Sequence, residues 1–340
     1  MQEDRQGALT REPALPGEAP VSNLAFSTRL IMRQEFWITI AVLAIGLAVS
    51  LVTDRFATYN NLSNIFQNFC FIGILAIGMT PVLISGGIDI SVGTLLGLTG
   101  ICLGMMLEAD VPLWLGMCAT LALGTALGSL NGLLIAYLRL PPFLVTLGML
   151  SIGRSMAFVI SDGQAVYSFG ASQDAIIAIG GGKMLGVANI VYALLVCAIL
   201  LQFLLSMTRW GRYVAAVGGN ERAARLTGLP VKPIKVSVYA FSGLMAGITA
   251  IFLVGWLGSI TNSLGQGDEL RVIAGTVIGG ASLAGGYGTA YGAVIGSLLI
   301  EVIRNGLLLA GVNPFWQGTF VGGFIILAIV LQRLHIKEED

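Results

Sequence analysis

Charged residues and histidine are scarce in this chain. Of its 340 residues, 11% are Asp, Glu, Lys or Arg, less than half of the roughly 25% that soluble domains carry. So few charges cannot cover a water-facing surface, which argues against a soluble globular enzyme. The one histidine, His335, excludes histidine-based metal sites, Ser-His-Asp triads and HExxH chemistry. Because acidic and basic residues are equal in number, nucleic-acid binding is also disfavoured.

Nucleotide-binding motifs are missing as well. The sequence has no GxGxxG and no GxxxxGK[ST]; the segment nearest to the latter, Gly182-Lys183, has Ile177 and Met184 at the required Gly and Ser/Thr positions. We therefore expect no cofactor and no metal, and any ATP must be hydrolysed by a partner. Four cysteines lie in apolar stretches without CxxC spacing, which is typical of buried thiols: Cys70, Cys102, Cys118 and Cys197.

Apolar residues dominate what is present. They make up 56% of the chain, the mean hydropathy is +0.86, and glycine occurs 46 times. This composition predicts an all-α polytopic membrane protein, because a helix of about 20 apolar residues spans a bilayer. About ten transmembrane helices are predicted, at 36–52, 65–84, 88–107, 112–136, 143–160, 187–207, 236–257, 270–284, 289–309 and 315–333.

Two of the joints between spans consist of little more than glycine. Ser85-Gly86-Gly87 separates the second and third spans, and residues 285–288 separate the eighth and ninth. Either joint could be a broken or re-entrant helix. Paired broken segments in the two halves of a chain are typical of repeat-built transporters, so an internal repeat is one interpretation. Small-xxx-small spacing, as in Gly124/Gly128/Gly132 and Gly243/Gly247, predicts close helix packing, with a path or rocking motion as the alternative.

The distribution of Lys and Arg predicts the orientation. With the N-terminus in the cytoplasm, thirteen of the 18 basic residues fall in inside segments, and the outside loops hold only Arg55 and Lys183. The opposite orientation would place the basic loop 208–235 outside. The predicted organisation is a cytoplasmic N-terminal tail (1–35), a transmembrane domain (36–333) and a cytoplasmic C-terminal tail (334–340).

Asp89 is the first candidate functional residue. It follows the glycine break in Gly86-Gly87-Ile88-Asp89-Ile90-Ser91, and an acidic group inside a membrane span is costly. Asp89 and Ser91 are therefore interpreted either as caps of the third span or as part of a translocation path or gate.

Other charges near or within spans have structural and functional interpretations. Glu301 and Arg304 share a helix face and predict an ion pair, and Arg154 must face the interior or an interface. Asp268 and Glu269, with Arg271, indicate either a solvated helix start or a docking contact.

The loop 208–235 is the strongest feature. It holds six basic residues and one acidic residue, Glu221. Asn220 is a good N-cap, residues 221–226 favour a helix, and Gly228 is a good C-terminal cap. The alternatives are an ordinary positive-inside loop and a docking helix for a cytoplasmic partner. The residues that would form such a docking surface are Gly218, Gly219, Asn220, Arg222, Ala223, Ala224 and Gly228.

Five ordered motifs across residues 55–333 resemble the permease subunit of ribose-type ABC monosaccharide importers. They are residues 75–82 (LAIGMTPV), 86–93 (GGIDISVG), 142–149 (PFLVTLGM), 216–224 (AVGGNERAA) and 269–286 with Asn305-Gly306. The resemblance implies a permease of the bacterial inner membrane that imports a monosaccharide or related polyol. It also implies three partners: a cytoplasmic ABC ATPase, a periplasmic or lipid-anchored sugar-binding protein, and a second permease subunit in a homo- or heterodimer. By position, the Gly218–Gly228 segment resembles the coupling helix.

Two other functions are compatible with the composition. A stand-alone, ion-coupled secondary transporter would use intramembrane carboxylates such as Asp89 and Glu301. A membrane scaffold without transport is disfavoured, because a scaffold does not need paired broken segments.

Overall fold

The computed structural model describes residues 34–313, 316, 318–320, 322–323 and 326. The predicted cytoplasmic tails, apart from Gln34 and Glu35, lie outside the described residues, as does most of the predicted tenth span. Seven described helices are long and apolar enough to cross a membrane. They are α2 (Gln34–Val52), α3 (Tyr59–Ile84), α5 (Leu113–Tyr137), α6 (Pro142–Ile160), α8 (Asn189–Met207), α11 (Val231–Leu257) and α13 (Ala290–Leu309).

Two further predicted spans correspond to shorter helices. The first, α4 (Val92–Glu108), has 17 residues and begins four residues later than predicted. The second, α12 (Asp268–Ile278), has 11 residues and ends six residues earlier than predicted. It ends there because Gly280, Gly285 and Gly286 take left-handed backbone conformations that an α-helix cannot contain.

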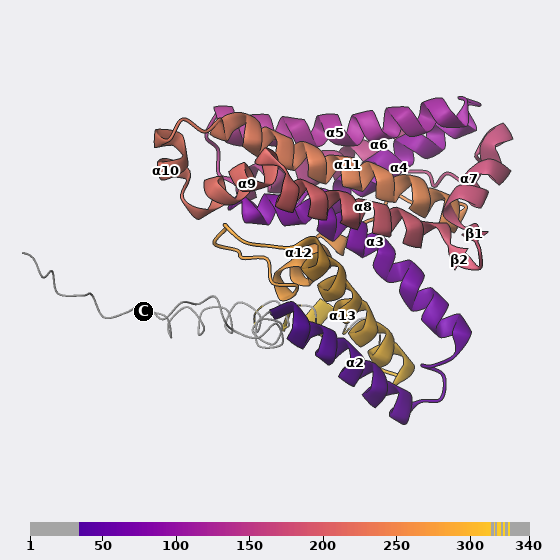
Figure 1. Ribbon diagram of the computed structural model, residues 1–340. Coiled ribbons are helices and arrows are strands. Elements are labelled where there is room, and N and C mark those ends of the chain that lie inside the picture. Colours follow the sequence, from indigo (N-terminus) through magenta and orange to yellow (C-terminus); the bar gives the residue numbers. More distant parts are fainter. Residues whose placement is uncertain (1–33, 314–315, 317, 321, 324–325, 327–340) are drawn as a thin grey trace, which may run out of the picture.

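Several elements between the spans were not predicted. The connection from α6 to α8 contains η2 (Gly170–Ser172), α7 (Gln173–Gly180) and a hairpin of β1 (Lys183–Met184) with β2 (Val187–Ala188). The connection from α8 to α11 contains two helices, α9 (Arg209–Gly219) and α10 (Glu221–Leu226), where one was predicted. These two connections mark opposite ends of the molecule, called here the α7 end and the α10 end (Figure 1).

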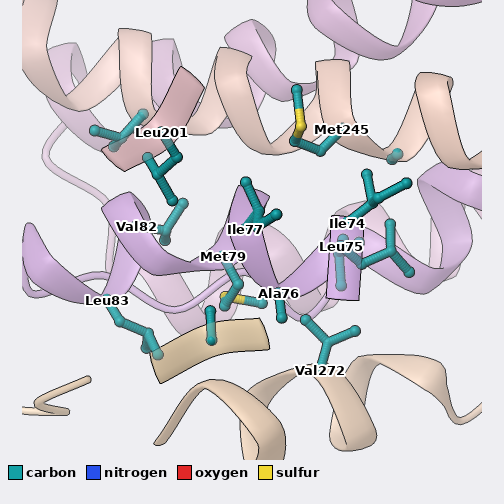
Figure 2. Close-up of a cluster of buried hydrophobic side chains, with 14 of the residues drawn as sticks. Ile74, Leu75, Ala76, Ile77, Met79, Val82, Leu83, Leu201, Met245 and Val272 are labelled. Atoms are coloured by element: carbon teal, nitrogen blue, oxygen red, sulfur yellow. The ribbon is translucent and has the colours of Figure 1, made fainter. Parts of the chain in front are cut away.

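The central helix is α3. It runs between a bundle formed by α4, α5, α6, α8 and α11 and a smaller layer formed by α2, α12 and α13 (Figure 1). Every residue from Phe69 to Ser85 is buried. Figure 2 shows Leu201 of α8 and Met245 of α11 on one side of this helix and Val272 of α12 on the opposite side. A helix that is apolar all round is expected in such a central position.

Glycines bring helix backbones together, as the small-xxx-small spacing predicted. A Cβ atom on Gly124 of α5 would overlap the carbonyl oxygen of Gly243 of α11. In the other layer, a Cβ on Gly279 would overlap the carbonyl oxygen of Gly292 in α13. Close backbone approach therefore packs helix pairs in both layers.

Candidate coupling surface and buried joint

Two short helices at the α10 end are fixed by local capping. The Thr208 hydroxyl accepts a hydrogen bond from the Gly211 amide at the start of α9 (3.4 Å). The Asn220 side chain accepts one from the Ala223 amide at the start of α10 (2.9 Å). Asn220 itself is extended, so the chain changes direction between α9 and α10. The predicted N-cap at Asn220 is confirmed.

The C-terminus of α10 is closed by Gly228. Its φ of +80° is left-handed, and its amide donates to the Arg225 carbonyl (3.2 Å) while the Leu229 amide donates to the Ala224 carbonyl (3.1 Å). This pair of bonds satisfies two carbonyl groups that the end of a helix leaves free. The predicted role of Gly228 in ending the helix is therefore confirmed, with Thr227 at the cap position itself.

Both helices are anchored to the first turns of α11. The Glu221 carboxylate accepts hydrogen bonds from Lys235 (2.7 Å) and Arg225 (2.8 Å). The bond from Lys235 holds the pKa of the Glu221 carboxyl below its usual range. The Trp210 indole donates to the Ser237 hydroxyl (2.7 Å) and ties α9 to the same helix. A force on α10 would consequently be transmitted to α11.

The predicted coupling residues divide into an exposed and an inward-facing group. Ala224 is buried, and a Cβ on Gly218 would overlap the Ile84 carbonyl oxygen, so these two residues pack against the protein. Leu226, which is not among the predicted coupling residues, is 85% exposed. An apolar residue among the charges of 221–226 is the signal that could have identified it. The exposed predicted residues are Gly219, Asn220, Arg222, Ala223 and Gly228.

The inward side of α9 meets both glycine-rich joints. Gly218 lies against the end of α3 at Ile84, and the Gly286 amide from the α12–α13 connection donates to the Ile84 carbonyl (2.8 Å). Three segments far apart in the sequence thus converge under the two short helices.

Asp89 is completely buried in the connection between α3 and α4. Its Oδ1 accepts hydrogen bonds from the Ser91 amide (3.0 Å) and the Ser91 hydroxyl (2.6 Å), and its Oδ2 accepts one from Ser242 of α11 (2.8 Å). The Ser91 hydroxyl also accepts a hydrogen bond from Asn131 of α5 (2.9 Å). Ser91 occupies the N-cap position of α4, but its side chain makes no capping bond. The pair therefore connects α4 with α5 and α11.

The other charged residues that were predicted to lie near or within spans have polar partners of their own. Glu301 and Arg304 form the predicted ion pair (2.9 Å). Arg154 faces inward, as expected, and donates to the carbonyl oxygens of Asn262 and Leu264 (2.9 and 3.0 Å). Asp268 stands in the first turn of α12 and pairs with Arg271 (3.2 Å), but its side chain is only 19% exposed, so this helix start is not a solvated one.

A family model described as the permease component of a branched-chain amino acid transport system matches residues 61–329. The chain belongs to this permease family. The ribose import permease protein RbsC of Escherichia coli strain K12 is 38% identical to this permease over 309 residues, 91% of this chain and 96% of that protein. The D-allose transport system permease protein AlsC of the same strain is 36% identical over 302 residues (88% and 92%). The L-arabinose ABC transporter permease protein AraH of Azospirillum brasilense is 33% identical over 296 residues (87% and 86%).

This permease is accordingly the membrane-spanning subunit of an ABC importer and a multi-pass protein of the bacterial inner membrane. It is a transport subunit, and ATP hydrolysis lies in a partner subunit. An importer of this kind also works with a binding protein. The ion-coupled, stand-alone alternative receives no support from these relatives.

Proposed function

We propose that this permease imports a monosaccharide or a related polyol that a sugar-binding protein delivers. The observation that carries the proposal is the likeness, over almost the whole chain, to permeases for ribose, D-allose and L-arabinose. These three sugars are small neutral polyols, so the shared chemistry of the cargo is a set of hydroxyl groups. A second permease subunit, identical or homologous, would complete the pore.

The α10 end is proposed to face the cytoplasm and to dock on the ATPase. Thirteen of the 18 basic residues fall on the cytoplasmic side in this orientation, and an excess of Lys and Arg on that side is typical of membrane proteins. The contact would be made by the exposed residues of α10 and its flanks, with Leu226 entering an apolar pocket of the ATPase. Gly218 and Ala224 would then hold α9 and α10 against the spans that must move.

Ten membrane crossings are proposed, of which α12 is the least complete. At 1.5 Å per residue its 11 residues span about 16 Å, roughly half of the apolar thickness of a bilayer. Of the two interpretations of Asp89 and Ser91, the hydrogen bonds favour the structural one. In this view both residues hold the joint that α9 touches, and they act on the path through its position.

Reconstitution into proteoliposomes tests the function. Vesicles containing the permease, its ATPase and its binding protein should accumulate one of these sugars when ATP is supplied on the α10 side. The permease alone, under an imposed proton or sodium gradient, should accumulate none. Sugar uptake by the permease alone would contradict the proposal.

A variant arm of the same experiment tests the coupling surface. Arg222→Glu combined with Ala223→Asp reverses the charge of the exposed face of α10, so uptake should be abolished while membrane insertion and Tm are retained. Arg212→Glu combined with Ala216→Asp, both on the exposed side of α9, is the control for an equal change of charge at the same end. Full uptake by the α10 variant would show that the ATPase docks elsewhere.

A further inference from the structure

A basic cavity of about 300 Å³ lies beside α10. It is bounded by the connection between α5 and α6 and by the first turns of α11. Four cationic side chains and one carboxylate line it: Arg139, Arg225, Lys232, Lys235 and Glu221. Its volume is at the lower end of the range of about 300–1,000 Å³ that is typical of ligand-binding cavities.

The positive charge of this cavity is only partly neutralised. Glu221 already pairs with Arg225 and Lys235. Lys232 lies over the ring of Tyr137, 4.8 Å from its centroid. Within residues 34–313, neither Arg139 nor Lys232 forms a salt bridge. Two cations thus remain available to an anion at the rim of a partly enclosed space.

The backbone at Arg139 is also unusual. Its φ of +56° is left-handed, a conformation that costs a non-glycine residue on the order of 1 kcal/mol. Residues 141 and 142, which follow, are both proline. An arginine thus stands beside the cavity at a position where glycine or asparagine is the usual residue.

The surroundings of the cavity are apolar on the side of α6. Leu140, Phe143 and Leu144 are all exposed, and they lie where α6 enters the membrane-spanning part of the molecule. A ligand with an anionic head and two hydrocarbon tails would satisfy both environments at once. Basic pockets at the cytoplasmic ends of spanning helices bind anionic lipid headgroups in this way.

We propose that this cavity binds the phosphate group of an anionic membrane lipid. The proposal rests on the cytoplasmic orientation of the α10 end given above. Arg139 and Lys232 bind the phosphate, and Arg225 of α10 contacts its other side. The bound lipid thereby joins the α5–α6 connection, α11 and α10, so the position of the coupling surface depends on the lipid.

Binding of a fluorescent phosphatidylglycerol to the full-length permease in a neutral detergent tests the proposal. Each Lys or Arg near a phosphate contributes about fivefold in affinity, so Arg139→Ala combined with Lys232→Ala should weaken binding about 25-fold. Arg212→Ala, which removes an exposed cation of α9 outside the cavity, should leave the affinity unchanged. Phosphatidylcholine should compete poorly.

Two further arms identify the source of the phosphate and protect against misfolding. Millimolar inorganic phosphate should fail to displace the lipid; complete displacement would indicate a free-phosphate site and overturn the proposal. Arg139→Lys with Lys232→Arg keeps both charges and should keep the affinity, whether or not the alanine variant folds. If phosphatidylglycerol binds this variant or the native permease no more tightly than phosphatidylcholine does, the proposal is wrong.

A protein ligand gives a different pattern. If the alanine variant binds lipid normally but no longer co-purifies with the ATPase, the cavity is a protein contact and the proposal is overturned. Because lipid binding is measured without sugar, ATP or other subunits, its failure is distinguishable from failure of the transport function.

Discussion

A single carboxyl group connects three helices at the joint between α3 and α4. Asp89 accepts hydrogen bonds from two groups of Ser91 and from Ser242, and Ser91 accepts one from Asn131. All four residues are fully buried. A buried donor that loses its acceptor costs about 1–3 kcal/mol, so this network stabilises one arrangement of the joint against alternatives.

Asp89→Ala should therefore be strongly destabilising. It leaves the Ser91 amide, the Ser91 hydroxyl and the Ser242 hydroxyl without their acceptor, and the Tm of the purified permease should fall by at least about 5 °C. Asp89→Asn keeps an acceptor for Ser91, and the Ser242 hydroxyl can rotate to accept from the new amide group, so it should lose much less.

Sugar uptake by the asparagine variant separates the two interpretations of this residue. A structural Asp89 predicts that Asp89→Asn retains most of its uptake, because the hydrogen bonds are preserved. A stable asparagine variant without uptake would show instead that the acidic group itself acts in the path.

Some residues of the candidate site could be predicted from the sequence because their roles depend on local signals. The caps at Asn220 and Gly228 depend on a few neighbouring residues, so the sequence contains the information. Ser242, which donates to Asp89, is 153 residues away in the sequence, and no pattern in one sequence connects the two residues. The inward position of Gly218 and Ala224 likewise depends on where α3 and the α12–α13 connection lie. The sequence therefore could not distinguish these two residues from the exposed predicted coupling residues.

At the scale of elements, hydropathy located the long helices but not their ends. The apolar run from 279 to 284 was predicted to continue the eighth span, whereas α12 ends at Ile278. Hydropathy measures transfer into lipid and does not record the left-handed glycines that stop the helix. The helix α9 was missed although Trp210, Val214 and Val217 recur at helical spacing, because its charges dominated the interpretation as a loop.

Close packing of α5 and α11 gives a prediction at this scale. In Gly243→Ala, the new methyl group would overlap the carbonyl oxygen of Gly124, so the two backbones must separate along their contact. We expect the Tm of the purified permease to fall by several degrees, since overpacking of this kind costs about 1–3 kcal/mol.

The matched control is Gly148→Ala on α6. Apart from the neighbouring residues and the backbone of α6 itself, nothing lies within 4 Å of the added Cβ at this position, and alanine favours a helix over glycine by about 1 kcal/mol. Thermal melts of both variants should therefore shift in opposite directions. Equal shifts would mean that the contact of α5 with α11 does not depend on glycine.

At the scale of the whole molecule, the central position of α3 was not predictable. In the most apolar 18-residue stretch of each helix, the buried share is 94% for α3 and 28% for α6, although the two stretches have the same mean hydropathy. Lipid tails are as apolar as a protein core, so composition does not separate a central helix from a peripheral one. Helix class and approximate spans follow from the sequence, while the layering follows from packing.

The two ends of the molecule provide a test of its orientation. Leu226 at the α10 end is 85% exposed, and Leu185 in the turn between β1 and β2 at the α7 end is 92% exposed. Both are apolar residues outside the predicted spans, so each can be replaced by cysteine without loss of a buried contact. The four native cysteines, at 70, 102, 118 and 197, would first be replaced by alanine.

In intact cells, a membrane-impermeant maleimide should label the Leu185→Cys variant, because it reaches only the outer face. The Leu226→Cys variant should be labelled only after the membrane is opened, since the basic residues beside α10 are proposed to hold that end in the cytoplasm. Equal labelling after opening is the control for reactivity. If intact cells gave the reverse pattern, the α10 end would face outward, where no ATP-driven partner could reach it, and both the coupling surface and the inward direction of transport would have to be abandoned.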